Sequence, residues 1–158
     1  MLKVFHQYSE LNIPDLLAVY EEGIIESGCS RFHAEQDLCD YLREDFFAVP
    51  GSYYALWCQE DHYVCGLRME PYRDGYLLSG LETAPRERRK GYGMALVQAV
   101  CELTAPIYTH IHRTNLPSLR LHKKCGFVEI LDFGVLLDGT VSNRYVTLCY
   151  GHKNPTSD

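Results

Sequence analysis

The stretch LETAPRERRKGYGMAL, residues 81–96, connects the end of an expected strand to the start of an expected helix. Pro85 ends the strand, and Gly91 and Gly93 precede an apolar helical pattern. A helix start presents free backbone N–H groups and the positive end of the helix dipole. Because glycines let a ligand approach that backbone closely, the stretch predicts a cradle for an anion. Four preceding cations reinforce it: Arg86, Arg88, Arg89 and Lys90.

Other binding motifs compete with this interpretation. A Walker loop needs Gly-Lys-Ser/Thr after a four-residue gap, which is absent, and a dinucleotide fingerprint needs a small residue where Leu96 stands. A nucleic-acid patch needs further basic and aromatic residues on the same face. On spacing alone, a plain solvated loop and a pyrophosphate site are equal alternatives.

A second informative stretch is NLPSLRLHKKCGF, residues 115–127. Helical spacing puts Asn115, Ser118 and His122 on one polar stripe, with Leu121 and Cys125 as a neighbouring apolar pair. Such a stripe is typical either of an exposed face or of a face against a polar ligand. The spacing alone does not choose between the two.

Taken together, the two stretches resemble the GNAT superfamily of acyl-CoA N-acyltransferases. Arg88, Gly91 and Gly93 match its Arg/Gln-x-x-Gly-x-Gly/Ala signature, while Thr83 and Pro85 match the end of its fourth strand. The second stretch matches the run Asn…Ser/Ala…Leu-Tyr-x-Lys-x-Gly-Phe at Asn115, Ser118, Leu121, Lys124, Gly126 and Phe127. The resemblance covers residues 77–127, about a third of the chain.

The resemblance implies acetyl-CoA as cosubstrate. In such a protein the amides of residues 89–94 would hold the coenzyme A pyrophosphate, and the backbone of Leu81 and Thr83 would pair with the pantetheine arm. Asn115, Ser118 and His122 would line the other side of the thioester. The implied cofactor-binding residues are Leu81, Thr83, Arg88, Arg89, Lys90, Gly91, Tyr92, Gly93, Met94, Asn115 and Ser118.

The catalytic candidates are His122 and Glu82. Many family members have a tyrosine acid where this chain has His122; a neutral imidazole can donate one N–H hydrogen bond, and a thiolate with a pKa of about 8.5 also departs with little help. Glu82, near the end of its strand, is the candidate base. His110 and His112 are weaker candidates, and as an H-x-H pair they lack a third metal ligand, so no metal is expected. The family needs no covalent intermediate, so Cys125 is expected to be a core thiol.

The expected fold is α/β (α+β), with a mixed, mostly antiparallel sheet of about seven strands and helices on both faces, in the GNAT-like order β-αα-βββ-α-β-α-ββ. Residues 1–158 are expected to form a single GNAT-like acetyltransferase domain. Strands are predicted over residues 3–8, 52–61, 62–72, 76–83, 107–112, 127–137 and 144–150. Helices are predicted over residues 11–22, 34–47, 93–103 and 116–125.

Composition excludes several protein classes. With 46% hydrophobic and 23% charged residues, the chain has the composition of a globular domain. It has no apolar run of the roughly 20 residues that a membrane span needs, and no signal-peptide stretch at its start. Seven cysteines without a C-x-x-C indicate neither a disulfide framework nor a zinc knuckle. A reduced, cytoplasmic protein without a membrane role is expected.

Charge is divided unevenly along the chain. Residues 1–80 carry 5 Lys/Arg and 14 Asp/Glu, a balance of −9, and residues 81–158 carry 10 and 7, a balance of +3. Overall acidity disfavours nucleic acid as a partner. The basic half suits a polyanionic cofactor, and the acidic half favours either a cationic acceptor or simple solubility.

We therefore expect an N-acetyltransferase that moves an acetyl group from acetyl-CoA to a primary amine of a small molecule or peptide by direct attack. The acceptor pocket is expected to involve residues 25–32, residues 68–72 and the turn at residues 138–143. Arg31, in the first of these segments, is a candidate partner for a carboxylate of the substrate. A homodimer is compatible with the sequence. The alternatives are a coenzyme A-binding sensor without turnover, suggested by His122, and a nucleic-acid-binding module built on residues 86–90.

Overall fold

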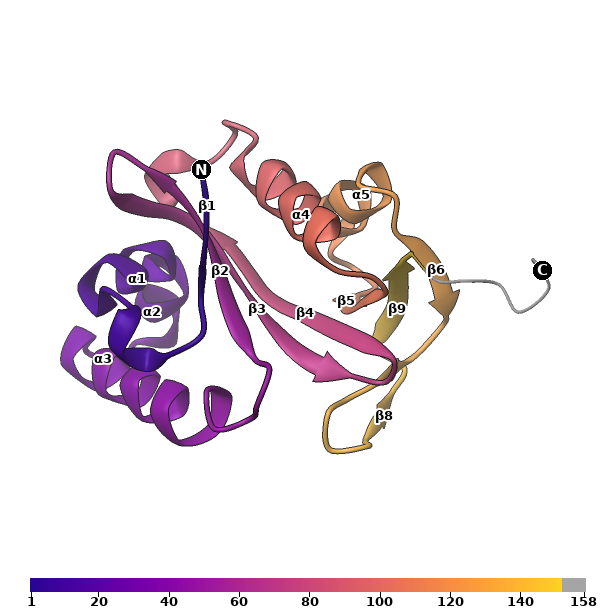
Figure 1. The fold of residues 1–158 in the computed structure, drawn as a ribbon, viewed down its shortest axis with the longest axis horizontal. Helices are drawn as coiled ribbons and strands as arrows, with labels where there is room; N and C mark the ends of the chain where they lie inside the picture. Colours follow the sequence, from indigo (N-terminus) through magenta and orange to yellow (C-terminus); the bar gives the residue numbers. More distant parts are fainter. Residues whose placement is uncertain (152–158) are drawn as a thin grey trace.

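The computed structural model describes residues 1–151 (Figure 1). Residues 152–158, the end of the expected single domain, lie outside the described residues. Seven strands form one sheet in the order β1-β2-β3-β4-β5-β9-β6, in which only the β4–β5 pair is parallel. Their bounds are β1 Leu2–Phe5, β2 Tyr53–Gln59, β3 His62–Tyr72, β4 Gly75–Thr83, β5 Ile107–His112, β6 Val128–Leu131 and β9 Tyr145–Tyr150.

Alternation along β2 gives this sheet two buried faces. Tyr53 and Ala55 belong to the core under α4 (Tyr92–Leu103). Tyr54 and Leu56 belong to a separate core under α1 (Ile13–Val19). Because successive strand side chains point to opposite faces, a strand with apolar residues at both parities must be covered on both sides.

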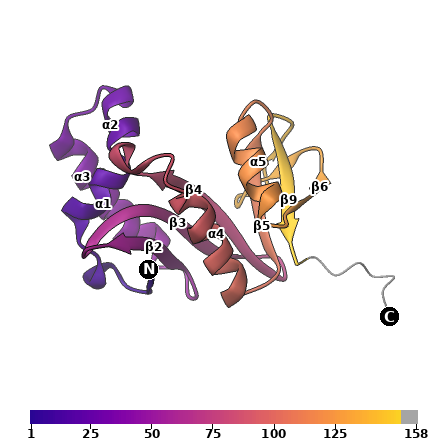
Figure 2. The same cartoon turned by 90° about the horizontal axis from the view of Figure 1, so that it is seen from above.

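Helices accordingly cover both faces (Figure 2). α1, α2 (Glu21–Ser27) and α3 (Arg31–Asp40) lie on one side, and α3 continues into a π-helical segment, Tyr41–Phe46. α4 lies on the other side with α5 (Leu116–Lys124) next to it. Short 3₁₀ turns occupy Tyr8–Glu10 and Pro85–Glu87. The expected mixed sheet with helices on both faces is confirmed.

Several expected elements have different bounds. The strand predicted over residues 3–8 spans Leu2–Phe5, and a 3₁₀ turn begins at Tyr8. The helix predicted over residues 11–22 is interrupted at Tyr20, whose hydroxyl is bonded to the sheet through the Gly80 carbonyl. The helix predicted from residue 34 begins at Arg31, because the Ser30 hydroxyl caps it by accepting the His33 N–H at 3.2 Å. The capping serine, four residues before the predicted start, was the missed signal.

The strand predicted over residues 127–137 is wrong as a single element. It divides into β6 and β7 (Gly134–Val135), and β7 pairs with β8 (Val141–Ser142) in a small second sheet. The register of β6 against β9 shifts between Glu129 and Leu131, and Thr147 of β9 donates its hydroxyl hydrogen to the Phe133 carbonyl at 2.7 Å. The Thr147 side chain therefore holds the backbone at Phe133, just beyond the point where β6 stops pairing with β9.

Strands β4 and β5 pair over only three positions. Their ladder joins residues 76–78 to residues 107–109, and within the described chain residues 79–83 pair with β3 alone. A bulge marks the start of this unpaired edge: Gly66 and Arg68 face Glu82 and Ser79, leaving two β4 residues opposite Leu67. Residues 79–83 thus present backbone N–H and C=O groups with no partner strand on the β5 side.

Candidate active site

The junction between β4 and α4 leaves helix amides unpaired. Gly91 is the N-cap in the left-handed conformation, φ 83°, and no side chain caps the helix. The first hydrogen bond of α4 runs from the Ala95 N–H to the Gly91 carbonyl at 3.1 Å. The N–H groups of Tyr92, Gly93 and Met94 are therefore free to bind an anion at the positive end of the helix dipole.

A cleft of ≈ 340 Å³ opens at these amides. It brings together many of the predicted cofactor residues with one face of α5. From the end of β4, the following loop and α4 it is lined by Thr83, Glu87, Arg88, Arg89, Gly91, Tyr92, Gly93 and Met94, and from α5 by Pro117, Arg120, Leu121 and Lys124. The predicted residues Leu81, Lys90, Asn115 and Ser118 do not line it.

Sequence reasoning missed the α5 contribution. Arg120 and Lys124 are exposed, and both line the cleft. Their i, i+4 spacing was the available signal, because it puts them on one helical face with Pro117. A Cβ on Gly93 would approach Leu121 Cδ1 to 3.3 Å, so the glycine allows α4 and α5 to pack closely across the cleft.

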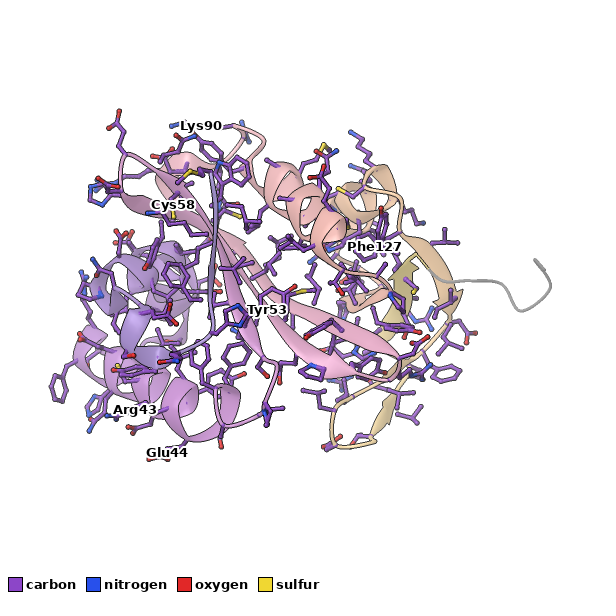
Figure 3. The ribbon with its side chains drawn as sticks, viewed as in Figure 1. Arg43, Glu44, Tyr53, Cys58, Lys90 and Phe127 are labelled. Carbon is purple, nitrogen blue, oxygen red and sulfur yellow. The ribbon has the colours of Figure 1, made fainter. Side chains whose placement is uncertain are left out.

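Two of the four predicted cations are already paired with acids. Arg88 forms an ion pair with Glu22 of α2 and lies 3.9 Å from a Glu82 oxygen. Lys90, at the tip of the loop that leads into α4 (Figure 3), bonds Glu87 at 2.7 Å. Within residues 1–151, Arg89, Arg120 and Lys124 form no ion pair, so these three supply the available positive charge of the cleft.

The unpaired edge of β4 continues from the cleft. Leu81 packs against the α4 core, and the Thr83 hydroxyl donates to Cys65 Sγ at 3.3 Å, so both side chains are committed to the protein. Their backbone groups on the β5 side have no ladder partner among the described strands. An extended ligand can therefore add there like a short strand.

The polar stripe of α5 is largely used within the helix. Asn115 caps the helix by accepting the Ser118 N–H at 3.3 Å. His122 Nδ1 lies 2.8 Å from the Ser118 carbonyl oxygen and 3.3 Å from its hydroxyl. Of the three residues only His122 is buried, and it packs edge-on against Phe127 with ring centroids 5.1 Å apart.

The Ser118 contact fixes the tautomer of His122. A carbonyl oxygen only accepts, so Nδ1 carries the proton and Nε2 has the lone pair. Burial lowers the pKa of His122, with the Ser118 bond opposing that shift, so the ring is neutral near pH 7. Nε2 is buried and has no partner in the described chain, which makes it an unfilled acceptor.

Glu82 lies on the sheet face that carries α1. It pairs with Gly66, and a Cβ built there would point toward Leu56 and Tyr54 of the α1 core. Its side chain is 49% exposed. Burial raises the Glu82 pKa; Arg88 opposes this shift, and Glu22 and Glu26 add to it. A carboxylate with a raised pKa is a suitable proton acceptor.

The remaining candidates have local partners. His110 Nε2 lies 3.5 Å from the Tyr72 hydroxyl, and burial followed by the charge of Arg73 lowers the His110 pKa. His112 Nδ1 contacts the Thr114 hydroxyl at 2.7 Å. Burial raises the pKa of the Cys125 thiol. Across residues 1–151 no three His, Cys, Asp or Glu side chains are grouped as a metal site would require.

Comparison with known proteins gives one family. Residues 17–127 match the family model described as the Acetyltransferase (GNAT) family. No curated protein matches the sequence. In the described part of the chain, no helix has the length and apolar character to cross a membrane.

Solved structures share the fold at low identity. The Campylobacter jejuni N-acetyltransferase PseH, in complex with acetyl coenzyme A, is 13% identical with a TM-score of 0.65, covering 97% of this chain and 100% of that one. The ribosomal-protein-S18-alanine N-acetyltransferase of Escherichia coli is 16% identical with a TM-score of 0.58, covering 99% and 98%. A Bacillus subtilis acetyltransferase in complex with CoA is 19% identical with a TM-score of 0.51, covering 65% and 76%.

Proposed function

Since this chain belongs to the GNAT family of acetyltransferases, we propose that it moves the acetyl group of acetyl-CoA to a primary amine of a small molecule or peptide by direct attack. Acetyl-CoA is the cosubstrate of this family. The observation that carries the proposal is the continuity of two features: free amides at the start of α4, and the unpaired edge of β4 that leads away from them.

The cleft fits the phosphates of coenzyme A. The amides of Tyr92, Gly93 and Met94 would bind the pyrophosphate, and the unpaired cations Arg89, Arg120 and Lys124 would neutralise its charge. The backbone of Leu81 and Thr83 would pair with the amides of the pantetheine arm. Arg88 and Lys90 would contribute to the field of the site while bonded to their acids, and Asn115 and Ser118 would act by shaping the start of α5.

The acceptor would approach from the α1 side of the sheet. Glu82 lies on this face, and Glu22 and Glu26 are close enough to raise its pKa. These acids favour an amine that arrives as an ammonium ion. Glu82 would take the ammonium proton, directly or through a water, and leave a nucleophilic lone pair on nitrogen.

The chemical step would then need little besides positioning. The amine nitrogen forms a bond to the thioester carbonyl carbon, the C–S bond breaks, and sulfur leaves with the electron pair as a thiolate. The second proton that the nitrogen still carries then passes to this thiolate, which yields the neutral amide and the free thiol. His122 on the thioester side would act as a hydrogen-bond acceptor through Nε2, because its only proton is held by Ser118. A thiolate with a pKa of about 8.5 departs without a protein acid.

The function is tested by thiol release from acetyl-CoA in the presence of a panel of primary amines, with mass detection of each product. We expect release that depends on the amine and an acetylated acceptor in the same reaction. Coenzyme A binding without release for any amine would favour the sensor, whose supporting observation is the missing proton on His122 Nε2. Salt-sensitive DNA binding that survives saturating coenzyme A would favour the nucleic-acid module.

A further inference from the structure

A guanidinium group lies directly against the bulge of β4. Arg68 of β3 is opposite Ser79, and a Cβ built on Gly80 would fall 2.7 Å from Arg68 Cζ. Gly80 has φ +66°, a conformation that glycine adopts without strain. Any side chain at residue 80 would displace the guanidinium, so the bulge and Arg68 form one unit.

The side chains in direct contact with this guanidinium are neutral tyrosines. Arg68 Cζ lies 5.5 Å from the centre of the Tyr41 ring, and Arg68 also bonds the hydroxyl of Tyr54, its cross-strand partner. The Tyr20 hydroxyl donates to the Gly80 carbonyl at 3.0 Å. Tyr20 and Tyr54 are also hydrogen-bonded, so the single proton of Tyr20 requires Tyr54 to be the donor between them.

Arg68 lacks a carboxylate partner. No Asp or Glu oxygen within residues 1–151 lies within 4.0 Å of its nitrogens, and its Nε is buried without an acceptor. Glu70, two residues along the same strand face, feels the charge of Arg68, but burial outweighs this and raises the Glu70 pKa. A largely buried guanidinium without a paired anion is costly for a protein to maintain.

The group nevertheless remains reachable. Arg68 keeps part of its surface exposed, and beside it the edge of β4 has no strand partner beyond Leu78. Arg68 and Glu82 point to the same face, because their partners on the neighbouring strands are both residues of the α1 side. Their rows are two residues apart, roughly 7 Å.

This face therefore has two poles of opposite charge. Glu82, Glu22 and Glu26 outnumber the single cation among them, Arg88, and form the negative pole. The Arg68 guanidinium forms the positive pole, at the bulge. An amine placed near Glu82 for attack on the thioester would have its neighbouring substituents beside Arg68.

We propose that Arg68 binds a carboxylate of the acceptor, so that the preferred substrates are amines carrying a carboxylate within a few bonds of the reacting nitrogen. This assignment rests on the acetyl-transfer function proposed above. A guanidinium presents parallel N–H donors that match a carboxylate. A phosphate dianion suits the site less well, because Glu70 would be beside its second charge.

Matched acceptors test this assignment, first with the wild type and then with variants of Arg68. We would measure kcat/KM for L-alanine, L-alaninamide and phosphoethanolamine, then repeat the assay with Arg68→Gln and Arg68→Lys. The wild type should prefer alanine over its amide by roughly 10- to 100-fold, mainly through KM. Arg68→Gln should remove this preference by lowering kcat/KM for alanine far more than for alaninamide, and Arg68→Lys should restore part of it.

Arg43→Gln is the control. Arg43, on the outer surface of the helical segment after α3 (Figure 3), also lies over a tyrosine ring, at 5.3 Å from that of Tyr8. It should leave the preference intact. Equal wild-type rates for alanine and its amide, a stronger preference for phosphoethanolamine, or an equal loss with both alanine acceptors in Arg68→Gln would each overturn the proposal.

A binding measurement separates this inference from acetyl transfer itself. Without acetyl-CoA, alanine should raise the melting temperature of the wild type and of Arg43→Gln but not that of Arg68→Gln, while alaninamide should have little effect. If no amine is acetylated yet this pattern holds, the transfer proposal fails and the carboxylate site stands. If amines are acetylated but alanine does not bind preferentially, the carboxylate site fails alone.

Discussion

The two ends of the unpaired β4 edge use different parts of the chain to meet a ligand. At the α4 end, backbone amides of three consecutive residues and a short run of loop and α5 cations form the cleft. At the bulge end, single side chains converge from β2, β3 and the two helical segments around Tyr20 and Tyr41. In the proposed function the first end would bind a group common to every acyl-CoA, whereas the second end would distinguish one amine from another. A shared cosubstrate can be held by backbone, but selectivity needs side chains.

The sharpest test of the acceptor end is Glu82→Gln. If Glu82 takes the ammonium proton, kcat/KM should fall by about 100-fold or more near neutral pH. Because burial raises the Glu82 pKa, wild-type activity should decline as pH falls through that raised pKa, and the variant should lose this part of the profile. Glu129→Gln, on the exposed edge strand β6, should behave like the wild type. A uniform response across pH would remove Glu82 as the base.

The cosubstrate end is tested by Gly91→Val. A β-branched residue is strained at φ 83°, so the helix start should reorganise and acetyl-CoA affinity should fall by roughly 30-fold. Gly139→Val provides a close match, since both glycines have nearly the same φ and no atom within 4 Å of a built Cβ. Calorimetric titration with coenzyme A should show weakened binding for Gly91→Val but not for Gly139→Val. Equal loss in both variants would indicate general destabilisation instead.

A smaller effect is expected from the α5 cations. Arg120→Glu and Lys124→Glu should each weaken coenzyme A binding by about tenfold at low salt, and by less as added salt screens the charges. Lys123→Glu makes the same charge change on the same helix outside the cleft and should have little effect. Alaninamide KM should not change in any of the three, which separates the two ends of the edge. If Arg120→Glu and Lys123→Glu bind coenzyme A with the same affinity, the assignment of the α5 cations to the cofactor site is contradicted.

The smallest kinetic effect should come from His122→Gln. Since the neutral imidazole has no proton on Nε2, kcat at pH 8 should stay within about threefold of wild type. Unfolding should respond more clearly. Burial lowers the folded His122 pKa, so the unfolded chain binds the extra proton first and stability falls as pH drops below about 6.5. The free energy of unfolding of the variant should therefore depend less on pH in this range. If kcat falls between pH 6 and pH 8 in the wild type but not in His122→Gln, His122 would instead act as an acid.

What the sequence predicts correctly here is local. The free amides at the start of α4 follow from residues 81–96, and the strand and helix order follows from apolar periodicity over short windows. The interruption at Tyr20 could not be predicted, because its cause is hydrogen bonds to Tyr54 and Gly80, residues 34 and 60 positions away. The Arg88–Glu22 pair spans 66 positions. Contacts between residues this far apart in the sequence produce no periodic pattern from which they could be predicted.

The same limit explains the error at residues 127–137. Their β-branched and aromatic residues favour one long strand, but the Thr147 hydroxyl and the register shift in β6 end it early. Arg120 and Lys124 differ, since their spacing was visible and only the position of the cleft was missing. Arg68 lies in one of the segments expected to border the acceptor, residues 68–72, but its contact with Gly80 could not be predicted because it depends on the bulge in β4.

The unpaired edge of β4 also bears on the tendency of the protein to aggregate in solution. An open strand edge is a template for another chain, and proteins usually protect such edges because edge-to-edge pairing leads to aggregation. A pantetheine arm bound along residues 79–83 would fill that template. Cosubstrate at a hundredfold excess over its dissociation constant would add about 2.7 kcal/mol to the folded state by mass action. Storage without coenzyme A should therefore shorten the lifetime of the protein, and the cellular acyl-CoA supply would act as its conformational protectant.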